Sequence, residues 1–253
     1  MRLKFINLNL WVGGTLWDNI IDFLKKENPD IIALQEVFNG HDRNREKRFH
    51  TLDALQDELG YPHMAFSPTF FDKSEGRGID VEEGNAIMSR FPVTSNREVF
   101  FDTPYQILTK DPGPDYSRIP RNLQHATLDI GETELNVFNT QGIWGFDGDD
   151  NERRLAQAQV IVKELGSLPR VILSGDFNVK EQTKSIALIE DRLKNIFKGE
   201  RTTSFNLKHK TSPGFATAVV DMVFASTDLK VIEHYQPDVN VTDHLPQVVV
   251  FEL

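Results

Sequence analysis

The sequence contains no cysteine, which excludes disulfide bonds and thiolate metal ligands. It has no run of about 18 apolar residues, the length that a membrane-spanning helix needs. Its first residues, Met1 to Phe5, enter a strand-like segment without the apolar stretch of a signal peptide. No repeat and no linker rich in proline, glycine or serine interrupts the chain. We therefore expect one domain over residues 1–253, a cytoplasmic monomer and no membrane partner.

The sequence also has few positive charges: it contains 28 lysines and arginines and 38 acidic residues, which give a net charge of −10. Bulk charge of this sign does not attract a polyanion. A nucleic acid partner would have to bind through local basic loops, for which Arg43 to Arg48 and Lys208 to Lys210 are candidates. Their plainer interpretation is a solvated surface. The 39% hydrophobic and 26% charged residues are typical of a globular protein.

Strand-like segments dominate the pattern and alternate with only three or four helices. Because the pattern includes hairpins, it favours an α+β fold of two mixed β-sheets packed face to face and flanked by helices over a doubly wound sheet. Long loops, where substrate choice is usually made, are expected at 39–48, 72–83, 102–120, 142–150 and 198–215. We expect helices at 16–27, 48–59, 151–165 and 183–193, and strands at 2–11, 30–37, 61–71, 84–90, 99–101, 123–130, 134–140, 171–174, 219–224, 230–235 and 247–253.

A short buried strand, Val171 to Ser174, leads directly into Gly175, Asp176 and Asn178. Residues two apart in an extended segment point to the same side. Asp176 and Asn178 could therefore face one spot at the carboxyl end of a strand, where open sheets place their sites. A simple turn built from these residue types is the alternative.

Other polar residues stand at strand ends in the same way: Asn9, Glu36, Asp221 and the pair Asp243–His244. Strand caps, turns and structural ion pairs are the alternatives to a site. Oxygen ligands of this kind suit a hard cation such as Mg²⁺ or Mn²⁺, and no cysteine or histidine cluster suggests zinc. A metal, a carboxylate, an amide and a histidine are the groups that phosphoester hydrolysis needs.

In this order and spacing the motifs resemble the endonuclease/exonuclease/phosphatase superfamily over the whole chain. The resemblance implies a four-layer α/β sandwich and divalent-metal-dependent hydrolysis of a phosphoester. The matching motifs are Leu8-Asn9, Leu34-Gln35-Glu36, Gly84-Asn85-Ala86-Ile87, Gly175-Asp176-Phe177-Asn178, Asp221 and Thr242-Asp243-His244-Leu245-Pro246.

The resemblance also implies a role for each matching residue. Glu36 would be the main ligand of Mg²⁺ or Mn²⁺, with Asn9 and Asp243 beside it. The catalytic roles fall to residues near the phosphate: Asp176 would orient or deprotonate the attacking water, Asn178 would contact that water or the phosphate, and His244 would face the phosphate while Asp221 holds it.

Four further residues are candidates for substrate binding. Arg121 and Asn85 match family positions that support the site or contact phosphate, although a surface salt bridge is an equal alternative for Arg121. Asn139 precedes the position where relatives carry a histidine. Trp144 lies in a Gly/Asp loop and could stack on an aromatic group or simply pack.

One departure from the family pattern stands out: relatives usually have Asn-Thr-His or Asn-Val-His where this chain has Asn139-Thr140-Gln141. Glutamine can donate a hydrogen bond but carries neither charge nor a transferable proton. Three explanations for Gln141 compete: it is a native adaptation, it marks a weak or inactive relative, or it is an engineered change. We expect a phosphodiesterase or nuclease; the alternatives are an enzyme for a small-molecule or lipid-derived phosphate and a non-catalytic relative.

Overall fold

The computed structural model describes residues 1–74 and 80–253, so the middle of the expected 72–83 loop lies outside the described residues. The described residues contain four α-helices, close to the expected positions. They are α1 (Trp17–Glu27), α2 (Thr51–Leu59), α3 (Glu152–Leu165) and α4 (Lys184–Glu190).

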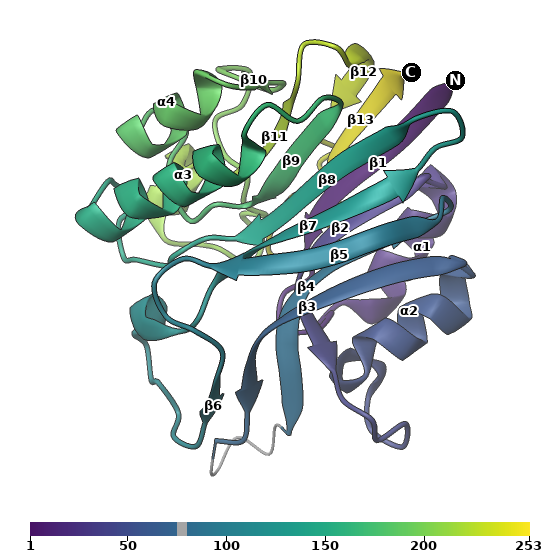
Figure 1. Cartoon of the computed structure of the whole chain (residues 1–253). Coiled ribbons are helices and arrows are strands. Elements are labelled where there is room, and N and C mark those ends of the chain that lie inside the picture. The colour runs from purple at the N-terminus through teal and green to yellow at the C-terminus, as the bar shows by residue number, and fades with distance from the viewer. Residues whose placement is uncertain (75–79) are drawn as a thin grey trace.

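Thirteen strands in the same described ranges form two mixed sheets, which confirms the expected α/β sandwich (Figure 1). The seven-stranded sheet has the order β12 (Lys230–Tyr235), β13 (Gln247–Glu252), β1 (Arg2–Asn9), β2 (Ile31–Asn39), β4 (Val81–Ser89), β3 (His63–Asp72) and β6 (Gln106–Leu108). The six-stranded sheet has the order β10 (Lys194–Asn195), β11 (Asp221–Ala225), β9 (Val171–Asp176), β8 (Glu134–Gln141), β7 (Asn122–Asp129) and β5 (Val93–Phe100).

The alternation of β1 shows how the four layers pack. Leu3 and Phe5 belong to the core between the two sheets, whereas Ile6 and Leu8 face the other way and pack beneath α1 and α2. A third apolar cluster joins the outer face of the six-stranded sheet to α3 and α4. Figure 1 shows the two helix pairs on opposite sides of the sheets.

Toward one end of the sandwich the core between the sheets turns from apolar to polar. A chain of amides crosses it: Gln35 Nε2 donates to Asn7 Oδ1 at 3.0 Å and to Asn139 Oδ1 at 2.6 Å. Asn7 Nδ2 donates to Gln247 Oε1, and Asn139 Nδ2 donates weakly to Gln124 Oε1. Buried amides are tolerated only when they are hydrogen-bonded. These amide hydrogen bonds therefore fix how one sheet is positioned on the other.

The structure corrects the expected elements in two places. The short strand at 99–101 is the end of a longer strand, β5, whose middle is polar and exposed at the sheet edge, so it lacks the apolar alternation that reveals a strand. The loop at 102–120 contains β6, which pairs in parallel with β3. Both are edge strands, for which sequence patterns are weakest.

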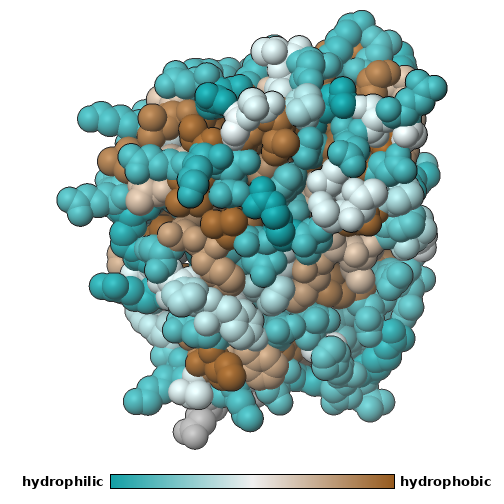
Figure 2. Space-filling view, viewed as in Figure 1, coloured by the Kyte–Doolittle hydropathy of each residue, from teal (hydrophilic) through white to brown (hydrophobic). Residues whose placement is uncertain are grey.

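The surface seen in Figure 2 is mostly hydrophilic, with hydrophobic side chains in several small separate areas. Among the described residues, none of the helices is long and apolar enough to span a membrane.

Candidate active site

Four polar pairs join the two sheets at one end of the sandwich, one pair for each step across the strands. We call them the polar row. One member of each pair lies in or just before β13, β1, β2 and β4, in that order, and the other lies in or just before β11, β9, β8 and β7. The pairs are His244–Asp221 at 2.8 Å, Asn9–Asp176 at 3.3 Å, Glu36–Gln141 at 2.8 Å and Glu83–Arg121 at 3.5 Å.

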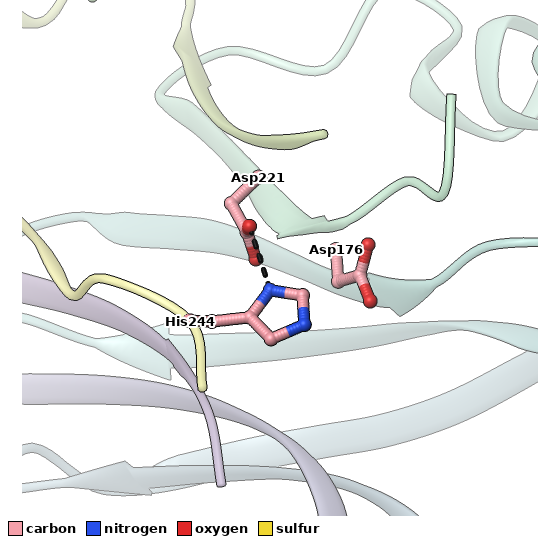
Figure 3. A group of neighbouring side chains, drawn as sticks. All are labelled: Asp176, Asp221 and His244. Atoms are coloured by element: carbon pink, nitrogen blue, oxygen red, sulfur yellow. Dashed lines mark hydrogen bonds and ion pairs between the residues drawn. The ribbon is translucent and has the colours of Figure 1, made fainter. Parts of the chain in front are cut away.

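The first pair gives His244 a defined protonation and direction. Its Nδ1 is hydrogen-bonded to Asp221 Oδ2, and both side chains are buried. Figure 3 shows the other ring nitrogen turned toward Asp176. Burial by itself lowers the pKa of His244, but the charges of Asp221 and Asp243 outweigh it and raise the pKa to about 10. The imidazolium therefore has an N–H available for a negatively charged group.

Asp176 lies at the end of β9 in the middle of the polar row. Burial and the nearby charge of Asp221 raise the pKa of Asp176 to about 7. Its oxygens accept from Asn9 Nδ2 and from the backbone N–H of Asn178 at 3.0 Å. A side chain at Gly175 would place a Cβ 2.0 Å from the Thr140 carbonyl oxygen, so only glycine lets β9 approach β8 this closely before the aspartate.

Glu36 is held by an unusual stretch of backbone. Trp11, Val12 and Glu36 itself all have φ near +55°, a conformation that is costly for a β-branched residue such as Val12. The turn directs Val12 N–H to Glu36 Oε2 at 2.8 Å and Trp11 N–H to Asn9 Oδ1 at 2.9 Å. The strain thus aligns two of the predicted metal ligands before anything binds.

Gln141 connects the middle of the polar row to its far end. Its Nε2 donates to Glu36 Oε1, and its Oε1 accepts from Arg121 Nη1 at 2.6 Å. Arg121 is 5% exposed and also lies beside Glu83. Burial raises the pKa of Glu83 to about 7, although Arg121 counteracts this rise. The glutamine uses both ends of its amide, which favours the native adaptation among the three explanations for its presence.

We expect Gln141→His to lower phosphoester hydrolysis by about 10–100-fold, because an imidazole carries its donor and acceptor on opposite sides of the ring and cannot keep both contacts in this geometry. Steady-state kinetics on an aryl phosphodiester measures the change, with the exposed Gln182→His as control. A large gain in rate would instead identify a site disabled by the glutamine.

Asp243 and Lys210 lie beside the polar row. Lys210 Nζ contacts Asp243 Oδ2 at 2.8 Å, while the buried Asp243 Oδ1 has no hydrogen-bond partner in the described parts of the chain. A buried carboxylate oxygen without a partner is costly unless a cation completes it. Oxygen donors from Glu36, Asn9 and Asp243 thus fit a hard divalent cation. A second grouping, Asp176, Asp221 and His244, has ligand atoms within 4.8 Å of one another and could also hold a metal.

The polar row forms part of the lining of a cavity of about 730 Å³. Trp144 lines it and makes edge-to-face contacts with Tyr116 and Phe146, which is 79% exposed at the rim. Among the described residues, each lysine or arginine of the lining is already paired: Arg121 with Glu83, Lys180 with Asp149, and Lys210 with Asp243.

The structure brings most predicted site residues together but places two elsewhere. Asn178 lines the cavity and its Nδ2 donates to the Gly142 carbonyl. Asn139 is fully buried in the amide chain between the sheets, and Asn85 Nδ2 donates to Asn122 Oδ1 behind the site; neither lines the cavity. Glu83 was missed, because its only sequence signal is an acid just before the Gly84-Asn85 motif.

Positive charges of the basic segment at 43–48 are engaged in ion pairs. Arg43 pairs with Asp53 and Asp57 of α2, and Lys47 pairs with Glu58. No residue of the segment lines the cavity within the described part of the chain.

Fold and site together define a class of proteins that act on phosphoesters. The model of the Endonuclease/Exonuclease/phosphatase family matches residues 7–244, and the chain belongs to this family, whose members hydrolyse phosphoesters. This confirms the family resemblance that the motifs indicated. A comparison with curated protein sequences gives no match.

Solved structures share the fold at low identity. An endonuclease/exonuclease/phosphatase from Beutenbergia cavernae superposes with a TM-score of 0.77 and 18% identity, over 100% of this chain and 72% of that one. The mannosyl-6-phosphatase Bt3783 of Bacteroides thetaiotaomicron gives 0.71 and 18%, over 99% and 100%. TDP2 of D. rerio, in complex with a single-strand DNA product, gives 0.72 and 15%, over 100% and 99%.

Proposed function

We propose that the protein is a divalent-metal-dependent phosphodiesterase. The observation that carries the proposal is the meeting of Asp176 and the His244–Asp221 pair beside Glu36 at the cavity. A carboxylate that accepts a proton near neutral pH stands next to an imidazolium that donates a hydrogen bond. These are the two groups needed to activate water and to stabilise the charge on a phosphate.

In the proposed mechanism Asp176 orients a water molecule and accepts its proton as the water oxygen bonds to phosphorus. Asn178 aligns that water or the phosphate from the same strand end. The free N–H of His244 donates to a non-bridging phosphate oxygen, and Asp221 keeps the ring charged and oriented. The bond from phosphorus to the leaving oxygen breaks, and that oxygen takes a proton from solvent water while Asp176 returns its proton to solvent. The products are an alcohol and a phosphomonoester.

We assign the metal to Glu36, Asn9 and Asp243, as Mg²⁺ or Mn²⁺. This set contains a buried carboxylate oxygen, Asp243 Oδ1, without a hydrogen-bond partner among the described residues, whereas the alternative group would disturb the hydrogen bond between His244 and Asp221 that orients the imidazole. When bound, the ion polarises a phosphoryl oxygen and neutralises developing charge.

The cavity's charge supports a diester over a monoester. A diester carries one negative charge and a monoester nearly two at neutral pH. The lining lysines and arginines that the structure describes are already paired with carboxylates, so besides His244 and the metal they add no unpaired positive charge for a dianion. A nuclease is a second candidate, favoured by the exposed aromatic rim of Trp144 and Phe146, on which bases could stack.

The test is hydrolysis of a panel of substrates with Mg²⁺ or Mn²⁺: an aryl phosphodiester, an aryl phosphomonoester, and single-stranded DNA, double-stranded DNA and RNA. We expect the diester to be hydrolysed best, with activity lost in EDTA. Glu36→Gln should raise the metal concentration for half-maximal activity by about tenfold or more, because one ligand charge is gone. Isothermal titration with the metal gives a second readout. Metal-independent turnover, or no turnover with metal bound, would overturn the proposal.

A further inference from the structure

The cavity continues beyond the last pair of the polar row into a region with apolar walls. We call this region the apolar arm. It lies past Glu83 and Arg121, toward the β3 and β6 edge of the seven-stranded sheet. Its walls are Phe38, Phe70, Leu108, Pro112 and Ile119.

Strand register shows that the walls of the arm share one face. Phe38 of β2 and Phe70 of β3 lie directly opposite Glu83 of β4, on either side of it. Directly opposite residues project from the same face of a sheet. Phe70 is in turn opposite Gln106 of β6, and Leu108, two residues on, projects to the same side as Gln106. Asp72, directly opposite Leu108, projects from this face as well, but neither it nor Gln106 lines the cavity. The walls of the arm are therefore apolar residues of one sheet face, next to a buried carboxylate.

The charges around the arm exclude a strongly anionic occupant. Glu83 is flanked by two phenyl rings, and the lining cation beside it, Arg121, is shared between Glu83 and Gln141. A second phosphate placed here would meet a carboxylate and desolvating rings. A polymer of phosphates is disfavoured at this end, whereas an uncharged apolar group gains by burial.

We propose that the apolar arm holds an uncharged apolar ester group of the substrate, so that the substrate class is a small phosphodiester with one compact alkyl or aryl substituent. This inference rests on the proposed phosphodiesterase function. The cavity of about 730 Å³ lies in the size range of sites for small molecules. Apolar contacts in the arm would then supply the selectivity that the paired cations do not.

The experiment measures binding rather than turnover, so that it does not depend on catalysis. The probes are methyl, butyl and hexyl esters of methylphosphonic acid, which are monoanions like a diester, and Kd is measured by calorimetry with Mg²⁺ present. We expect Kd to fall by about threefold for each added methylene, close to the ordinary gain for burying one.

Leu108→Asn tests the arm directly, and the adjacent Ile107→Asn is its control, because Ile107 is 61% exposed and does not line the cavity. We expect Leu108→Asn to weaken hexyl ester binding by about tenfold and methyl ester binding by less than twofold. The Ile107 variant should keep the full dependence on chain length.

The outcomes separate the two proposals. Equal Kd values for the three esters in the unmodified protein, or tighter binding of a dinucleotide than of the hexyl ester, would overturn the arm as an apolar site even if hydrolysis occurs. A steep dependence on chain length without hydrolysis of any diester would support the arm and overturn the phosphodiesterase function. This comparison needs no variant, so a variant that fails to fold does not block the test.

Discussion

Replacing Asp176 with asparagine should lower kcat for phosphodiester hydrolysis by about 10²–10⁴-fold, the usual contribution of a positioned general base. Asparagine has nearly the same shape but cannot accept a proton. Burial and the charge of Asp221 hold the pKa of Asp176 at about 7, so the carboxylate is a far better proton acceptor than an ordinary aspartate. Initial rates at saturating substrate measure the loss.

The same variant should be as stable as the parent protein, or more stable. The carboxylate is buried beside a second one, and removing its charge removes a repulsion. Unfolding in urea measures this, with the exposed Asp191→Asn as the control for both assays. A parent-like kcat would show that another group activates the water, and a large loss of stability would mean that the rate reports misfolding.

Replacing Asp221 with alanine should destabilise the protein by about 3–5 kcal/mol, the usual cost of breaking a buried ion pair from one side. His244 loses its partner at 2.8 Å and can keep neither its charge nor its orientation. Hydrolysis should fall with it. Urea unfolding at neutral pH measures the stability, and Glu233→Ala, on an exposed position of β12, is the control.

The cost of this change should depend on pH. Burial lowers the pKa of His244, but Asp221 and Asp243 raise it to about 10 in the folded protein, from an ordinary value of 6.5. A group whose pKa is raised on folding contributes its full stability below the unfolded pKa and loses it as pH rises through the folded one. The difference between parent and variant should therefore shrink between about pH 6.5 and 10. A difference that is constant across this range would mean that His244 is not charged.

The sequence predicts the site's middle better than its end. Asn9, Glu36 and Asp176 each come at or near the carboxyl end of an apolar strand, so the strand pattern places each of them at a strand end, where sites form. Glu83 is found only through register, because β-bulges in the neighbouring strands decide which residues stand opposite it. No local pattern contains that information.

Asn139 shows the opposite difficulty. It lies next to a motif position, so proximity in sequence suggested contact with substrate. It projects from the same face of β8 as Gln141 but lies two residues further from the strand end, so its side chain is deeper between the sheets, where Gln35 and two backbone carbonyls satisfy it. A buried amide and a ligand-binding amide look alike in sequence, and only the partners that surround them tell the two apart.

The polar row has a consequence for how this chain could be assembled or cut. Every pair joins the two sides of the sandwich, and its members come from distant parts of the chain: Asn9 ends β1, whereas His244 lies in the loop before β13. Neither sheet alone holds both residues of any pair. A shift of one residue in the register of a strand would turn its residue of the polar row away from the site. Hydrolysis is thus a direct reporter of correct docking. The seven-stranded sheet contains strands from both ends of the chain, so a single cut cannot separate the two sheets. A cut between α3 and β9 instead leaves Glu36 on one fragment and Asp176 and His244 on the other. Neither fragment alone should hydrolyse substrate, and turnover should return only on reassembly, as a split reporter requires.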